Sequence, residues 1–397
     1  MIPLGLTARE QRAFHRALRT EGYTLDVEVE LLTMSEKHVT TLNNIILGGQ
    51  IVVSGDEFIS RSLQMTMFAN PETGINPDRP EEAVYLNRML SVTYGVWVDE
   101  INRWVRVPVF RGPIVKASLD GNVLDIEALG KAHLMRGESG FTKVYRAGLK
   151  RTNVIRDIAR RSGERNMVIP DWSPKTGKKT VMVKVGPMSR PWTWMRIPAL
   201  SMRGQIFYDG AGTLRLRKVP VRPSWTFTPD QLLSEPKVTV DDEQVFNRVL
   251  VKGQPPEGKK GVVEAEGEIP RSHANSPFKL GRNGWHRNIT DVIEDSDIRT
   301  NKDARAARDR RLREILQTTL SVEFNCKPVP HLDANDVAYL DWSEWNGEFR
   351  VSEYTLPLMA GEPMAVGYRY VTRRHKGFFY MLELRARNRA RGRTRNR

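Results

Sequence analysis

Short segments in which apolar and polar residues alternate fill positions 24–129 and limit what this chain can fold into. In TLDVEVELLT (24–33) the apolar side chains fall on one face of a strand, because successive residues of a strand point to opposite sides. The residues of that face are Leu25, Val27, Val29 and Leu31. Similar segments follow: GGQIVVSG (48–55), RSLQMTMFA (61–69), LSVTYGVWV (90–98), RWVRVPVFRGPIVKASLDG (103–121) and NVLDIEAL (122–129). Gly, Asn and Asp separate these segments, and so the pattern predicts an antiparallel sandwich or barrel.

Two connections in this region are indicated by residues that favour turns. SLDGN (118–122) contains an Asp-Gly pair, and Gly121 can adopt the positive φ of a tight hairpin turn. ANPETGINPDRPEE (69–82) is rich in Pro, Asn and Asp, which is typical of a long projecting loop. We therefore expect a hairpin at the first connection and a loop at the second.

Helix-capping residues mark two helices. A hydroxyl at the N-cap and a carboxylate three residues later form a capping box, which satisfies backbone N–H groups that the first turn leaves free. Two such boxes precede predicted helices: Thr7 with Glu10 before a helix over about 8–20 that Gly22 ends, and Thr300 with Asp303 before a helix over 300–320.

The middle of the chain mixes helix and strand signals. KRTNVIRDIARRSGERN (150–166) is predicted to be a helix that Thr152 caps and Gly163 ends. RPWTWMRIPALSMRG (190–204) indicates a helical or irregular piece. Pro198 is expected to kink or break a helix there, because proline lacks an N–H and clashes with the preceding turn. A predicted hairpin follows, with the strands GQIFYD (204–209) and TLRLRKV (213–219).

Strand patterns return in the last third of the chain. The segments are VFNRVLVKG (245–253), GVVEAEGEIP (261–270), SVEFNCKP (321–328), NDVAYLDW (335–342), EFRVSEYTLPL (348–358) and MAVGYRYVTR (364–373). The chain is therefore expected to be an α+β protein that is mostly β, with two β-rich regions around a mixed middle. The predicted division is an N-terminal helix (1–22), a first β domain (23–130), a mixed α/β middle domain (131–242), a second β domain that includes the long helix (243–373), and a tail (374–397).

Cysteine content and hydropathy exclude several classes of protein. Cys326 is the only cysteine, so an intrachain disulfide and a cysteine-based zinc site are both excluded, and a reducing compartment for assembly is the simple interpretation. The N-terminal segment has its first charged side chain at Arg9, lacks a long apolar stretch, and does not resemble a signal peptide. The sequence holds no run of about 18 apolar residues, and we expect no membrane span.

Candidate motifs for catalysis and nucleotide binding are incomplete in this sequence. GQPPEGKKG (253–261) approaches a phosphate-binding loop, but Lys260 stands where the loop needs Ser or Thr, and its two prolines remove N–H donors. Ser276 and Lys279 form an S-x-x-K pattern, but in a polar loop rather than at a helix start. The seven histidines show no metal-ligand spacing. We therefore predict no catalytic, cofactor or metal site, and no enzyme.

The strongest compositional signal is the C-terminal segment RARNRARGRTRNR (385–397). Its evenly spaced cations repel one another, so we expect the segment to be unfolded on its own. It carries a large part of the chain's net charge of +15. It contains no aromatic residue to stack on bases, so binding to nucleic acid would be nonspecific. The candidate contacts for a polyanion or a protein partner are Arg385, Arg387, Arg389, Arg391, Arg393, Arg395 and Arg397.

In their order along the chain, these segments resemble the tail hub proteins of bacteriophages, which include baseplate hubs and the tail-tip proteins called minor tail proteins. The resemblance covers about 24–372 and leaves out the N-terminal helix and the Arg-rich tail. The segments on which the resemblance is based are RVPVFRGPIVKASLDGNVLDIEALG (106–130), RTNVIRDIARRSG (151–163), GQIFYDGAGTLRLRKVP (204–220), VFNRVLVKG (245–253), the Ala-containing helix over 300–320, and SVEFNCKPVPHLDANDVAYLD (321–341).

The resemblance implies a structural function without catalysis. Such hubs are homotrimers, and each chain carries two β-barrel domains that resemble tail-tube subunits. Three chains therefore form a pseudo-sixfold ring that joins a sixfold tube to a threefold tip, around a channel for the tape measure protein and DNA. The implied partners are a distal tail protein ring, the tape measure protein and tail-tip proteins, with transient DNA contact in the channel. The implied location is the virion, after assembly in the host cytoplasm.

Two other classes of protein remain as alternatives. One is a nonspecific nucleic-acid-binding protein that acts through the Arg-rich tail, and it predicts tight, salt-dependent binding to duplex DNA. The other is an enzyme such as a cell-wall hydrolase, for which the sequence offers no candidate acid, nucleophile or metal cluster.

Overall fold

The computed structural model describes residues 2, 4–20, 22–55, 59–69, 84–146, 148–172, 183–188, 190–202, 204–239, 246–255, 261–269, 288–295, 298–315, 321–342 and 346–371. The chain forms two compact units, each assembled from separate stretches of sequence. The first comprises Met1–Glu235, Asn325–Ala338 and Val351–Val366, and the second comprises Pro236–Phe324, Tyr339–Arg350 and Gly367–Arg397. The two units are described separately below.

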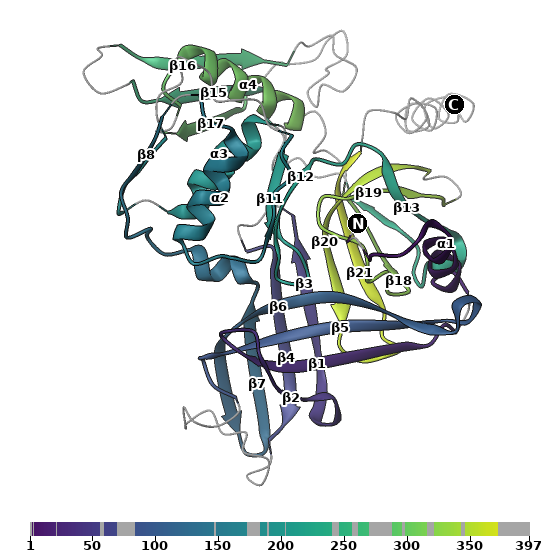
Figure 1. Ribbon diagram of the computed structural model, residues 1–397. Helices are drawn as coiled ribbons and strands as arrows, with labels where there is room; N and C mark the ends of the chain where they lie inside the picture. The colour runs from purple at the N-terminus through teal and green to yellow at the C-terminus, as the bar shows by residue number, and fades with distance from the viewer. Residues whose placement is uncertain are drawn as a thin grey trace, which may run out of the picture. The chain divides into compact units, whose positions relative to one another are not determined.

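A large antiparallel sheet forms the base of the first unit (Figure 1). Its neighbouring strands follow the order β20-β3-β4-β7-β6-β5-β1-β2. The strands are β1 (Leu25–Thr33), β2 (His38–Thr41), β3 (Ile46–Ser54), β4 (Arg61–Phe68), β5 (Arg88–Val98), β6 (Arg103–Asp120), β7 (Val123–Leu129) and β20 (Gly347–Pro357), which belongs to this unit from Val351 onward. The six segments predicted over 24–129 are all strands. The last two, β6 and β7, form a hairpin in whose turn Gly121 has φ 59°. The expected loop at 69–82 lies, apart from Ala69, outside the described residues.

The long strand β6 changes partner along its length. Its first part pairs with β5 as far as Pro113, and its second part pairs with β7 from Ile114. Gly112 lies at this change of partner, where a Cβ would stand 1.9 Å from the carbonyl oxygen of Leu129. Only glycine allows the two backbones to approach so closely, and so this residue lets one strand join two parts of the sheet.

The N-terminal helix α1 (Ala8–Ala17) packs on the first unit through one face. The predicted capping box is confirmed: the Thr7 hydroxyl accepts from the Glu10 N–H at 3.3 Å, and the Glu10 carboxylate accepts from the Thr7 N–H at 2.8 Å. Phe14 and Leu18 are fully buried. The helix ends at Ala17, and residues 18–20 form hydrogen-bonded turns in place of the expected last helical residues.

The middle part of the first unit places two helices against small sheets, and Figure 1 shows α2 and α3 side by side. Its elements are β8 (Lys143–Tyr145), α2 (Arg151–Arg161), β9 (Met167–Val168), β10 (Val183–Val185), α3 (Pro191–Ser201), β11 (Gly204–Tyr208) and β12 (Leu214–Lys218). The predicted hairpin is confirmed as the pair β11–β12, and Gly163 follows α2 with φ 89° as expected. Apolar residues of both helices and both hairpin strands form one core, which includes Ile155, Met195, Ile206 and Leu214.

One local prediction for this part is wrong, and the break that Pro198 could have caused is absent. The N-cap of α2 is Lys150, and Thr152 lies inside the helix, where its buried hydroxyl donates to Asp171 Oδ1 at 2.9 Å. A carboxylate from a later segment therefore satisfies the hydroxyl that was expected to cap the helix. Pro198 does not break α3, which continues from Pro191 to Ser201. Proline at this position removes one N–H near the helix end, and burial of the helix in the core outweighs that loss.

The second unit contains a three-stranded sheet with a helix on one face. Its strands β15 (Arg248–Gly253), β16 (Val263–Glu268) and β17 (Thr290–Asp295) have the order β16-β15-β17, and β15 is antiparallel to β16 and parallel to β17. Helix α4 (Asn301–Ile315) packs against β15 and β16 through Ala304 and Ile315. Its predicted cap is confirmed, since the Thr300 hydroxyl accepts from the Asp303 N–H at 3.2 Å.

The remaining strands are β13 (Pro223–Phe227), β14 (Lys237–Thr239), β18 (Ser321–Cys326), β19 (Val337–Leu340) and β21 (Met364–Val371). The pairing of β14 with β18 is antiparallel. The protein is thus mostly β, with a large antiparallel sheet and small mixed sheets, as its alternating segments predict. Among the described helices, none has the length and apolar character needed to cross a membrane.

Candidate functional site

One face of the large sheet carries a band of polar side chains. The strand registers place Gln50, Gln64, Glu127 and Lys116 in one row across β3, β4, β7 and β6. The next row contains Thr66, Asp125 and Ser118. Residues next to these positions along the strands, such as Leu63, Met65 and Ile126, are buried. Because side chains of a strand alternate, the same strands supply both an apolar core and a polar outer surface.

An open cavity of about 880 Å³ lies on this polar face. Its lining residues are Gly49, Gln50, Gln64, Met65, Thr66, Lys116, Ser118, Asp125, Ile126, Glu127, Thr355, Pro357, Glu362 and Pro363. Gly49 forms part of the floor with φ 145°, and a Cβ there would stand 2.4 Å from the Gln64 carbonyl oxygen. Glycine is therefore required where β3 approaches β4 beneath the cavity.

The cavity wall has an acidic balance of charge. Three carboxylates, from Asp125, Glu127 and Glu362, face the single ammonium group of Lys116. Lys116 Nζ lies 2.9 Å from Glu127 Oε1, and the Thr66 hydroxyl donates to Asp125 Oδ1 at 2.7 Å. Such a surface attracts cations and repels polyanions. Within the part of the chain that the structure describes, no group of three or more His, Cys, Asp or Glu residues is arranged to hold a metal ion.

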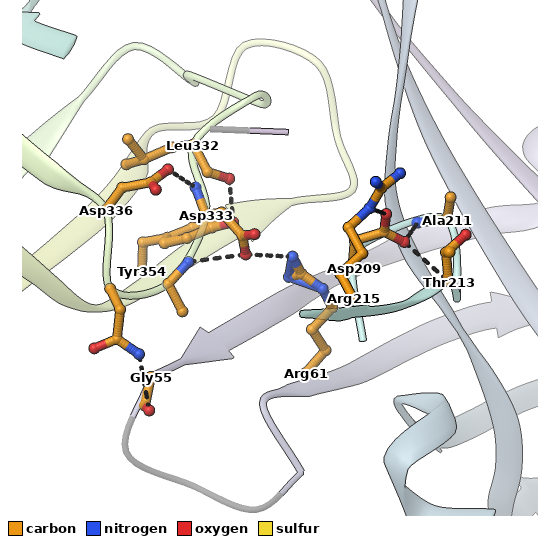
Figure 2. A network of polar contacts seen from close by, with 12 residues as sticks. Gly55, Arg61, Asp209, Ala211, Thr213, Arg215, Leu332, Asp333, Asp336 and Tyr354 are labelled. Atoms are coloured by element: carbon orange, nitrogen blue, oxygen red, sulfur yellow. Dashed lines mark hydrogen bonds and ion pairs between the residues drawn. The ribbon is translucent and has the colours of Figure 1, made fainter. Parts of the chain in front are cut away.

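A buried polar network fixes the segment 332–336 against β4 (Figure 2). Arg61 Nη2 donates to Asp333 Oδ1 at 2.7 Å, and both side chains are almost fully buried. Figure 2 shows Asp336 beyond Asp333, where its Oδ2 accepts from the Asp333 N–H at 2.9 Å. Arg217 Nη1 lies 3.1 Å from Asp336 Oδ1 and 3.5 Å from Asp333 Oδ2. Two carboxylates thus lie beside two guanidinium groups, and such contact between opposite charges is how buried charges are tolerated.

The environment of this network shifts the pKa values of its members. Burial is the largest single influence and lowers the pKa of Arg61, but Asp333, Tyr354 and Asp209 together outweigh it, and the pKa is raised. Burial raises the pKa of Asp336, and the neighbouring Asp333 adds to this increase. The network also includes Tyr354, whose hydroxyl donates to the Leu332 carbonyl at 2.7 Å. These contacts hold β4, β12, β20 and the segment 332–336 in one arrangement.

A third carboxylate, that of Asp209, holds the turn of the β11–β12 hairpin. Asp209 Oδ1 accepts from the N–H groups of Ala211 and Thr213 at 3.0 Å and 2.9 Å, and Arg215 pairs with its other oxygen (Figure 2). A Cβ on Gly210 would stand 2.2 Å from the Pro108 carbonyl oxygen, so the turn lies directly on β6. The mixed middle part is therefore attached to the sheet at a defined point.

The site residues proposed from sequence are not brought together by the described structure. The seven arginines over 385–397 lie outside the described residues, as do Ser276, Lys279 and Lys260. GQPPEGKKG begins at the last residue of β15 and ends just before β16, and these two strands are antiparallel neighbours in which Gly253 pairs with Val263. This pairing agrees with a hairpin connection rather than a phosphate-binding loop. Sequence reasoning missed the polar face: its polar residues alternate visibly along β4 and β7, but their alignment across strands depends on register.

Comparisons with known proteins show which solved structures have a similar fold. No protein-family profile matches the sequence, and no curated protein matches it at a significant level. Among solved structures, the 43 kDa tail protein of prophage MuSo2 from Shewanella oneidensis is similar over 87% of this chain and 98% of its own, with a TM-score of 0.58 and 11% identity. A tail protein from Neisseria meningitidis MC58 is similar over 89% of this chain and 98% of its own, with a TM-score of 0.55 and 10% identity. The chain thus has the fold of prophage tail proteins, in agreement with the resemblance found in its sequence.

Proposed function

We propose that this protein is a structural component of a phage tail and that it forms the hub between tail tube and tail tip. The observation that supports the proposal is the fold likeness, which spans 98% of each of the two tail proteins and most of this chain. Because one fold can host many functions, the proposal rests on the extent of the likeness together with the sequence. Here the likeness agrees with a sequence that offers no catalytic group. We infer that the protein acts by assembly rather than by catalysis.

The proposed assembly is a homotrimeric ring. Two tail-tube-like β-barrel domains in each chain, at 23–130 and 243–373 with the mixed domain 131–242 between them, would give three chains six similar wall segments. Each chain then meets its neighbour through two different surfaces, and the ring closes after three copies. This arrangement matches a sixfold tube on one side and a threefold tip on the other. The proposed partners are a distal tail protein ring, the tape measure protein and tail-tip proteins within the virion.

The acidic cavity face gives this proposal a chemical basis. If the polar face of the sheet lines the channel, the carboxylates of Asp125, Glu127 and Glu362 repel the phosphates of passing DNA. Contact with DNA is then transient, because the described residues of this face offer only Lys116 as a cation to retain it. The Arg-rich segment 385–397 is proposed to contact the tube axis or a neighbouring tip protein. Normal particle assembly and DNA delivery after deletion of 385–397 would count against both roles.

The mass of the purified full-length chain in solution tests the trimer. Light scattering coupled to size-exclusion chromatography should give three times the chain mass of 45.4 kDa. The measurement is made in the presence of the distal tail protein ring as well, because a ring can require its neighbour to close. A monomer under both conditions would contradict the proposed assembly.

A nonspecific nucleic-acid-binding protein remains the second candidate, and the Arg-rich tail is the observation that favours it. This candidate predicts tight binding to duplex DNA, with an affinity that falls steeply as salt rises. Seven phosphate contacts correspond to a slope of about −6 in a plot of log K against log salt. The matched variant lacks 385–397. The hub proposal predicts weak binding by both forms, whereas the alternative predicts that the deletion abolishes tight binding.

A further inference from the structure

Four aromatic rings meet where the N-terminal helix α1 packs on the first unit. His15 and Phe14 come from α1, Trp225 from β13, and His331 from the segment that precedes the buried polar network. The two imidazole rings are stacked, with centroids 5.1 Å apart and planes inclined by 29°. Trp225 meets both rings edge-on, at 5.2 Å from His15 and 5.1 Å from His331. Phe14 meets His331 at 5.2 Å.

Four ring nitrogens of this cluster are buried and have no hydrogen-bond partner within the described part of the chain. They are Nδ1 and Nε2 of His331, Nε2 of His15 and Nε1 of Trp225. His331 is only 1% exposed, so its ring is removed from bulk water. A neutral imidazole tolerates such a site at moderate cost, but an imidazolium would be a buried cation without a counterion. The packing of these rings therefore depends on both histidines staying neutral.

The charges that act on the two rings are all positive. His331 faces His15, and the pKa of His331 is lowered by burial first and by the charge of His15 second. The pKa of His15 is lowered by burial and then by Arg19, whose guanidinium lies over Trp225 at 5.1 Å from the ring centroid. The carboxylates of the same segment, Asp333 and Asp336, are engaged with Arg61 and Arg217. β13 contributes Trp225, which carries no charge.

The other attachments of α1 respond differently to pH. Phe14 and Leu18 are buried apolar contacts that do not titrate near neutral pH. Two ion pairs, Arg16 with Glu100 and Arg103 with Glu10, join α1 to the tip of the β5–β6 hairpin. Their side chains are substantially exposed, and exposed pairs contribute little to stability. The histidine pair is thus the part of this attachment that mild acid changes.

We propose that the His15–His331 pair makes α1 a pH-sensitive latch, which stays packed on the first unit at neutral pH and opens below about pH 6. In the open state both imidazoles are solvated and take up protons near their ordinary pKa of about 6.5. In the closed state protonation is opposed by burial and by the neighbouring cations. Acid therefore favours opening, because the open state binds more protons than the closed state. The inference does not depend on the proposed tail function.

The expected size of the effect follows from these protonation states. Between pH 7.5 and pH 5.0, the opening equilibrium rises about 30-fold for each histidine that stays neutral when closed. His331 alone accounts for about that factor, and full participation of His15 would bring the total to nearly 10³.

Hydrogen exchange of the full-length chain, read by mass spectrometry at pH 7.5 and pH 5.0 and corrected for intrinsic rates, tests the latch. We expect the protection of α1 amides to fall by about 30-fold or more at pH 5.0, while β3 and β4 keep theirs. The variants His15→Phe and His331→Phe keep a ring without a titrating group, and each should reduce the pH effect. The controls are His38→Gln on an exposed strand and His133→Gln in the middle part, which should leave it unchanged.

Three results would overturn the proposal. One is protection of α1 that does not change between the two pH values in the unmodified protein. Another is an undiminished pH effect in His15→Phe, a position that is not fully buried and tolerates substitution even where His331→Phe fails to fold. A pH effect removed by His133→Gln instead would assign the response to the middle part and would also refute the latch.

Discussion

Replacing Asp333 with Asn should destabilise the protein far more than removing the arginine that it binds. Arg61 is 2% exposed, and Asp333 Oδ1 at 2.7 Å is the acceptor of its Nη2. Its Nε and Nη1 have no partner among the described residues. The raised pKa of Arg61 keeps it charged at neutral pH. Asp333→Asn therefore leaves a buried cation without its close counterion, a change that typically costs about 3–5 kcal/mol.

The reverse change leaves Asp333 with other partners. After Arg61→Met, its carboxylate still accepts from the Ala334 N–H at 2.9 Å and lies 3.5 Å from Arg217. The expected cost is the loss of one charged hydrogen bond, about 1–3 kcal/mol. The double variant Arg61→Met/Asp333→Asn has no unpaired cation, so it should be more stable than Asp333→Asn alone. The two substitutions are thus predicted to be strongly non-additive.

Comparison of the two single variants, the double variant and the unmodified chain forms a double-mutant cycle. The free energies of unfolding are measured by thermal and urea unfolding, with tryptophan fluorescence as the signal. A loss of 3–5 kcal/mol corresponds to a decrease in Tm on the order of 10 °C for a domain of this size. The reasoning is refuted if Arg61→Met costs as much as Asp333→Asn. It is equally refuted if the double variant shows the sum of the two single effects, because that sum means that the charges do not interact.

Three further predictions concern backbone, cap and thiol. Gly112→Ala should destabilise by about 1–3 kcal/mol or more, because its Cβ would meet the Leu129 carbonyl oxygen at 1.9 Å, whereas Gly137→Ala, with open space around it, should change unfolding free energy by less than about 0.5 kcal/mol. Thr7→Ala should cost about 0.5–2 kcal/mol in local stability of α1, measured by hydrogen exchange, and an unchanged α1 would contradict the role of the capping box. Cys326 is buried, and burial raises the pKa of its thiol, so a thiol reagent at pH 8 should label it only after denaturant is added; rapid labelling of the native protein would contradict this burial.

Features set by residues close in sequence could be predicted. The capping box of Thr7 and Glu10 spans three residues, and the hairpin at Gly121 is fixed by a single turn. The strands of 24–129 follow from alternation, because each places one apolar face on the core. The order of these segments was also sufficient to suggest the fold that the comparisons with solved structures support.

Features set by contacts between distant segments could not be predicted. Thr152 binds Asp171 rather than capping its own helix, and no local pattern indicates that choice. Arg61 and Asp333 are 272 positions apart, so their ion pair depends on the complete fold. The short parallel strands β9 and β17 carry no alternation of their own and are held by β12 and β15. The polar cavity face also depends on register, which the sequence of one strand cannot supply.

Electron microscopy of the purified full-length protein, alone and with a distal tail protein ring, tests the central claim most directly. The account predicts class averages of a threefold particle with six wall segments around an open centre. A monomeric particle under both conditions, or three copies that meet around a filled centre, would contradict it.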